Sequence, residues 1–171
     1  MAPRTARALS GLMTALILAA CAPEPAPADA GLWPEVFRRD LYPEWITLKP
    51  DIRWPPNDGC AAAPTPQVLP AGALIDRFGS ENGQFFSPKG EPYAARAVPY
   101  VCERMAYTVY RVVKPLAVKA CMAAPWFGEP GGATQYQSAD PAARLREAGL
   151  IEVVDGGAGG TTTTASPCPA H

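Results

Sequence analysis

The sequence has little of what most enzymes use for acid–base or metal chemistry. Its only histidine is His171, the last of 171 residues, and it contains no CxxC or His-containing metal pattern. No acidic loop of the EF-hand type is present either. Zinc and calcium sites need clustered side chains of these kinds, so the sequence predicts no metal site. The chemistry has to come from other residue types.

The chain also lacks an excess of positive charge and a long hydrophobic run. Its formal net charge is −1 at pH 7, and removal of an N-terminal signal carrying Arg4 and Arg7 would make it more acidic. A nucleic-acid partner therefore has no electrostatic support. The apolar segment 8–20 is too short to span a bilayer as a helix. The length that remains is enough for one domain and not for two.

The N-terminus has the pattern of an export signal, with a basic start and a short apolar segment. Residues 1–21 end in Leu-Ala-Ala-Cys, the form of a bacterial lipobox in which Cys21 is lipidated and becomes the mature N-terminus. Ordinary cleavage after the small-x-small segment 28–30 is the alternative. Segment 22–31 is a Pro-rich tether. We expect an exported protein, either a membrane-anchored lipoprotein or a secreted one, that contacts a membrane only through a lipid anchor.

Four cysteines remain after Cys21 is set aside, and an even number in an exported chain is typical of disulfides. Four cysteines allow three connectivities, and their spacing does not select one. Free buried thiols are the alternative. The disulfide candidates are Cys60, Cys102, Cys121 and Cys168.

Proline is abundant, with 21 residues, and predicts a loop-rich chain with few long helices. Residues 32–53 predict an N-terminal arm with a short helical turn. Strands are expected at 73–76, 85–86, 107–113, 117–121 and 150–154, with 107–113 and 117–121 forming a hairpin.

A helix is predicted between the last two of these strands. Asp140 is its expected cap, Pro141 its first residue, Leu145 its buried position and Gly149 its end. The fold class is therefore α+β: a small, sheet-dominated, loop-rich single domain with one short C-terminal helix before the last strand. Residues 156–171 form a low-complexity tail.

Two arginines stand among aromatic residues and glycines, Arg77 in DRFG and Arg96 in AARAVP. The guanidinium fork matches phosphate oxygens and also stacks on rings, so this composition favours an anionic, planar ligand. A structural ion pair with a core phenylalanine is the alternative for DRFG. The aromatic candidates are Phe78, Phe85, Phe86, Trp126, Phe127 and Tyr136.

Four segments in order carry a resemblance to a known family: WPPNDG, LIDRFGSENGQFFSP, KGEPYAARAVP and APWFGEPGGATQY. Together they resemble the TNT domain, the NAD-glycohydrolase module of the tuberculosis necrotizing toxin and of secreted fungal NADases. The resemblance covers residues 54–155. It implies hydrolysis of the nicotinamide–ribose N-glycosidic bond of NAD+, with NAD+ or NADP+ as substrate, no cofactor, and an immunity protein as a partner.

The resemblance also implies roles for individual residues. Arg77 and Gln135 match the family's catalytic arginine and glutamine, and Arg96 matches a phosphate-binding arginine. Structural alternatives are an ion pair from Arg77 to Asp76 or Glu81, a solvated Arg96, and a strand-surface Gln135. The remaining substrate-binding residues expected from the resemblance are Phe78, Phe85, Thr108, Trp126 and Tyr136, with ordinary core packing as the alternative for the aromatic ones.

Two positions depart from the family pattern. Thr108 stands where relatives often have a histidine implicated in activity, and Thr cannot carry a proton at neutral pH. Glu129 replaces a usual glutamine, and we expect it to point outward or to contact the cationic nicotinamide. Two alternative functions follow: a non-catalytic surface lipoprotein of the same fold that binds a nucleotide or protein, and a transferase of ADP-ribose.

Overall fold

The structure is a computed structural model and describes residues 35–47, 51–156 and 168–169. Its strands are β1 (Thr65–Leu69), β2 (Leu74–Phe78), β3 (Phe85–Pro88), β4 (Tyr107–Val112), β5 (Leu116–Met122), β6 (Thr134–Ser138) and β7 (Ile151–Gly156). The one α-helix of the described residues is α1 (Ala142–Glu147). Short 3-10 turns are η2 (Arg39–Leu41), η3 (Asn57–Gly59), η4 (Ala94–Arg96) and η5 (Cys102–Arg104).

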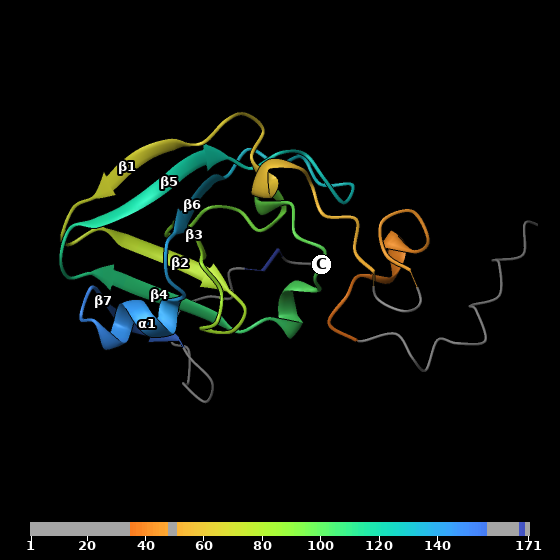
Figure 1. The fold of residues 1–171 in the computed structure, drawn as a ribbon. Coiled ribbons are helices and arrows are strands. Elements are labelled where there is room, and N and C mark those ends of the chain that lie inside the picture. The colour runs from red at the N-terminus through yellow and green to blue at the C-terminus, as the bar shows by residue number, and fades with distance from the viewer. Residues whose placement is uncertain (1–34, 48–50, 157–167, 170–171) are drawn as a thin grey trace, which may run out of the picture.

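The seven strands form one antiparallel sheet in the order β1-β5-β6-β3-β2-β4-β7. The sheet curls, so that β1 and β5 lie across from β4 and β7 (Figure 1). Residues of a strand alternate between its two faces, so every second one points inward. Because the sheet curls, inward residues from strands at both ends of the strand order meet in one core. The buried cluster contains Leu69, Ile75, Phe86, Tyr110, Val112, Leu116, Val118, Ala142, Leu145 and Ile151.

The predicted α+β class is confirmed, including the short helix before the last strand. Leu145 is buried in the core, and Gly149 follows the helix with a left-handed φ of 63°. The predicted cap is wrong. Pro141 occupies the N-cap position, and no side chain caps the helix. Asp140 instead accepts a hydrogen bond on its backbone oxygen from Ser138 Oγ at 2.6 Å.

The predicted hairpin of 107–113 with 117–121 is also wrong. Both strands exist, but β4 pairs with β2 and β7, whereas β5 pairs with β1 and β6. The turn at Lys114-Pro115 carries the chain from one end of the strand order to the other. The local sequence cannot distinguish this connection from a hairpin, because each needs only a tight turn between two apolar strands.

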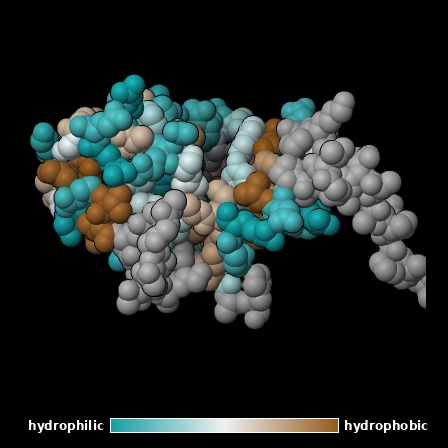
Figure 2. Space-filling view, turned by 90° about the horizontal axis from the view of Figure 1, so that it is seen from below, coloured by the Kyte–Doolittle hydropathy of each residue, from teal (hydrophilic) through white to brown (hydrophobic). Residues whose placement is uncertain are grey.

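The N-terminal arm packs against the domain. Phe37 bridges to Tyr100, and the two rings stack with centroids 5.2 Å apart. A second buried cluster joins Leu41, Ile46 and Phe127, so the arm shares a core with the loop after β5. Figure 2 shows hydrophobic surface at the end of the molecule away from the arm. The exposed large hydrophobic residues include Val113, Val153 and Val154.

Two disulfides confirm the predicted role of the four cysteines and select one of the three connectivities. Cys60 pairs with Cys121, and Cys102 pairs with Cys168. The second bridge joins residue 168, in the tail, to the turn before β4. The predicted signal, lipidation site Cys21 and tether lie outside the described residues. No helix among residues 35–47, 51–156 and 168–169 has the length and hydropathy needed to cross a bilayer.

Candidate functional site

A cleft of about 660 Å³ opens beside the ends of β2, β3 and β6. Loops from distant parts of the chain build its walls. The arm contributes Val36, the η3 turn contributes Asp58, and the loop after β2 contributes Asn82. Among the sequence-predicted residues, the structure brings together Arg77, Phe78, Phe85, Arg96, Phe127 and Gln135. The segments that carry the resemblance therefore meet at one place.

Arg77 is almost fully buried at the edge of this cleft, with 7% of its surface exposed. Its Nε and Nη1 atoms have no hydrogen-bond partner among the described residues. Its guanidinium carbon lies 5.7 Å from the centre of the Phe86 ring. Burial lowers the pKa of Arg77, and the nearby Tyr110 and Glu81 oppose that shift. An arginine stays charged nonetheless, so the site holds a desolvated cation with unused donors.

The predicted ion-pair alternatives for Arg77 are not what the structure contains. Asp76 points to the opposite face of β2, since neighbouring residues of a strand alternate, and Glu81 Oε2 lies 2.6 Å from Arg146 Nη1. A buried polar group without a partner costs about 1–3 kcal/mol. Such a cost is commonly retained where a ligand supplies the missing partner.

Arg96 is held by protein groups. Its Nη1 lies 2.6 Å from Asp76 Oδ1, an ion pair rather than an aligned hydrogen bond, and Nη2 donates to the Glu91 backbone oxygen at 2.9 Å. Its guanidinium carbon is 5.0 Å from the Phe78 ring centre. Asp76 Oδ2 accepts from Tyr107 Oη at 2.8 Å and from the Gly90 amide at 3.0 Å. Arg96 is thus a fixed, neutralised part of the cleft wall.

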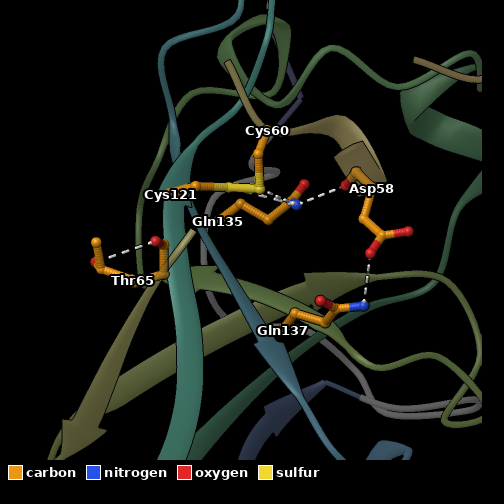
Figure 3. Close-up of a disulfide and its surroundings, with 7 residues drawn as sticks. Asp58, Cys60, Thr65, Cys121, Gln135 and Gln137 are labelled. Carbon is orange, nitrogen blue, oxygen red and sulfur yellow. Dashed lines mark hydrogen bonds between the residues drawn. A yellow bond between two sulfur atoms is a disulfide. The ribbon is translucent and has the colours of Figure 1, made fainter. Parts of the chain in front are cut away.

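Gln135 lies on β6 and reaches the η3 turn and a disulfide (Figure 3). Its Nε2 donates to the Asp58 backbone oxygen at 2.9 Å, and lies 3.8 Å from the Sγ atoms of both Cys60 and Cys121. Gln135 and Gln137 point to the same face of β6, because they are two residues apart in a strand. Gln137 Nε2 donates to Asp58 Oδ2 at 3.4 Å.

Aromatic rings line the cleft as the sequence predicts, but not all the predicted ones. Phe85 is the first residue of β3, lines the cleft and is 41% exposed. Phe78 packs edge-on against Tyr93, with centroids 4.7 Å apart. Phe127 is fully buried, has a φ of 53°, and forms part of the wall. Trp54, which sequence reasoning did not single out, is 53% exposed at the mouth.

Three of the predicted substrate-binding residues lie off the cleft lining. Thr108 is buried on β4 opposite Arg77, and its side chain hydrogen-bonds Tyr110. Trp126 donates from Nε1 to the Arg53 backbone oxygen at 2.7 Å. Tyr136 packs against the main core on the face of β6 opposite Gln135. Their contact with a substrate stays a prediction.

Glu129 is not among the residues that line the cleft, and it forms an ion pair with Arg38 of the arm. Neither of its two predicted arrangements anticipated this partner, because the arm is distant in sequence. Asp76 was also missed as the anchor of Arg96. The sequence feature that could have identified Asp76 is its place inside a buried strand, two residues before Phe78. A buried carboxylate needs a cation as its partner. In the described part of the chain, no three His, Cys, Asp or Glu side chains come together as metal ligands would.

Comparisons with known proteins show which family and fold this chain resembles. The family model described as "Tuberculosis necrotizing toxin" matches residues 68–154. A similar curated protein is the conidial surface nicotinamide adenine dinucleotide glycohydrolase nadA of Aspergillus fumigatus, 35% identical over 115 residues. That alignment covers 60% of this chain and 49% of the relative, so the chain spans about half the length of that protein. The fold is similar to that of tuberculosis necrotizing toxin solved in complex with its immunity factor IFT, with a TM-score of 0.51 and 21% identity over 61% of this chain and 62% of that one.

Proposed function

Because the chain belongs to the tuberculosis necrotizing toxin family, we propose that it is an exported NAD+ glycohydrolase. It hydrolyses the bond between nicotinamide and ribose and releases ADP-ribose. The observation that carries this proposal is the buried Arg77 guanidinium, which offers unpaired donors beside a cleft lined with aromatic rings. A dinucleotide presents the matching chemistry, since it combines a diphosphate with flat rings.

The reaction suits a site with little acid–base equipment. Nicotinamide in NAD+ is already a cationic, good leaving group, so the protein mainly holds the diphosphate and orients the ribose. Arg77 binds the diphosphate, and Gln135 contacts the ribose or the water from the opposite wall. Phe85 stacks on a ring of the substrate. Arg38 neutralises Glu129, which removes a charge that would repel the diphosphate.

Cellular context forms part of the proposal. The related A. fumigatus protein is named a conidial surface protein, and the necrotizing toxin was solved with an immunity factor. We propose a toxin-like role outside the producing cytoplasm, with an immunity protein as partner and Cys21 as a lipid attachment site. The two disulfides of the described domain fit an oxidising compartment.

The test is release of nicotinamide from NAD+ by the purified, oxidised protein, followed by chromatography. We expect turnover that Arg77→Ala and Gln135→Ala each reduce by at least about 100-fold. Arg111→Ala is the matched control, because Arg111 is an exposed arginine that pairs with Glu152 away from the cleft. It should retain full activity.

Absence of turnover by folded, oxidised wild-type protein would overturn the proposal. A second candidate would then take its place: a surface protein of the same fold that binds a nucleotide without cleaving it. Thr108 favours this candidate, because the family resemblance leads us to expect a histidine at this position and threonine cannot carry a proton at neutral pH. Saturable binding of ADP-ribose without nicotinamide release would identify it.

A further inference from the structure

Asp58 is the one carboxylate among the described residues that line the cleft, and its role rests on the proposed function. Of the described residues in the lining, the titratable side chains are Arg77, Arg96, Tyr100 and Asp58. Arg96 is neutralised by Asp76. Burial raises the pKa of the Tyr100 hydroxyl, which makes it a poor base at neutral pH. Asp58 is therefore the only group in this lining suited to accept a proton or face a developing positive charge.

The backbone of Asp58 is held in an unusual conformation. Asn57 and Asp58 both have φ of 54°, in the left-handed region. This region disfavours side chains by about 1–2 kcal/mol, although Asn and Asp tolerate it best. Such conformations persist where the surroundings impose them, and they cluster at functional sites. The turn thus fixes where the Asp58 carboxylate stands.

Contacts from β6 and the adjacent disulfide impose this conformation. Gln135 holds the Asp58 backbone oxygen and Gln137 holds Oδ2, both from the same face of the strand (Figure 3). Cys60, two residues further along the chain, is tied to Cys121 of β5. Gln135, which we place next to the scissile bond, therefore holds the backbone of Asp58, and Gln137 holds its carboxylate.

We propose that Asp58 is a catalytic residue of the glycohydrolase reaction. As the bond from the ribose C1′ to the nicotinamide nitrogen breaks, its electron pair leaves with nicotinamide, which becomes neutral. Positive charge develops on the ribose, and the Asp58 carboxylate stabilises it electrostatically. A water oxygen forms the new bond to C1′, and its proton passes to Asp58 and then to solvent. The products are ADP-ribose, nicotinamide and one proton.

Asp58→Asn tests the proposal with little change of shape. Asn is accepted in the left-handed region, and its side-chain oxygen can still accept from Gln137. General acid–base catalysis contributes about 10²–10⁴-fold, so we expect kcat to fall by about 100-fold or more. KM and ADP-ribose affinity should change by less than about threefold, because the carboxylate acts on the transition state. Asp140→Asn is the matched control, an exposed carboxylate outside the cleft lining, and should keep full activity.

Retained ADP-ribose binding shows that the Asp58→Asn variant has folded, so a lower kcat then reports on the reaction itself. Equal kcat for Asp58→Asn and wild type would overturn the inference while leaving the proposed function intact. No nicotinamide release by wild type would remove both.

Discussion

The absence of a side chain at Gly83 leaves the space that the buried Arg77 guanidinium occupies. A Cβ atom built on Gly83 would lie 2.0 Å from Arg77 Nη2, 2.5 Å from Nη1 and 2.7 Å from Cζ. These separations are far inside van der Waals contact. The Gly83 backbone lies outside the left-handed region, so alanine strains only the contact with the guanidinium. Because a guanidinium is the far end of a flexible side chain, we expect Gly83→Ala to displace Arg77 and leave the fold intact.

The size of the effect follows from the bonds that Arg77 would lose. Hydrogen bonds to charged groups are worth about 1.5–3 kcal/mol, which corresponds to a loss of about 10- to 150-fold in kcat/KM on NAD+. The free energy of unfolding should fall by less than about 1 kcal/mol, because displacement also removes a desolvated, unpaired cation from the interior. Nicotinamide release and urea unfolding measure the two quantities separately.

A double-mutant cycle then identifies the route of the effect. If Gly83→Ala acts through Arg77, the Gly83→Ala/Arg77→Ala variant should be no less active than Arg77→Ala alone. Additive losses from the two substitutions would refute the reasoning, and so would a Gly83→Ala variant with wild-type activity.

Three further predictions concern stability. Asp76→Asn should lower the free energy of unfolding by about 3–5 kcal/mol, since it leaves the buried Arg96 uncompensated; an unchanged urea midpoint would show that the pair is dispensable. Replacing both Cys60 and Cys121 by alanine should lower the free energy of unfolding by about 4 kcal/mol, because the disulfide closes a loop of 61 residues. The same variant should turn over NAD+ more slowly, because Gln135 loses its contact with the disulfide. Equal urea midpoints for oxidised wild type and variant would contradict the stability prediction. Burial raises the pKa of the Tyr93 and Tyr110 hydroxyls. The unfolded chain therefore releases these protons first, so stability is complete below about pH 10 and falls above it by about 1.4 kcal/mol per pH unit for each tyrosine. Urea midpoints from pH 9 to 12 test this, and a flat series would argue against it.

The strands and the helix could be read from local patterns in most cases. The β-rich run 107–113 and the Pro141 to Gly149 segment each carry enough periodicity and punctuation to specify an element. Strands β1 and β6 were not among the predicted strands. Segment TPQVL of β1 contains a proline, and TQYQS of β6 is mostly polar, so neither forms an alternating apolar pattern. Strand pairing was not readable, since the register of β4 depends on contacts with β2 and β7 that lie far away in sequence.

The candidate site divides in the same way. The resemblance selected Arg77, Arg96, Phe85 and Gln135 as candidates, and the structure brings all four to the lining of one cleft. Their roles in the reaction stay predictions. Which arginine keeps free donors was not readable. That depended on Asp76 pointing toward Arg96, on the opposite face of β2 from Arg77.

The sequence alone thus determined which groups this protein carries: the strand-forming segments of a sheet-dominated domain, four cysteines available for two disulfides, and arginine, aromatic and amide side chains suited to a dinucleotide. Only the tertiary structure decided how charge is shared among them. It paired Arg96 with Asp76 and Glu129 with Arg38. It left Arg77 buried, with donors that have no partner among the described residues. It also brought Asp58 within hydrogen-bond distance of Gln135 and Gln137. The physical reason is that electrostatic and hydrogen-bond energies depend on distance and burial, which are set by chain segments far apart in sequence.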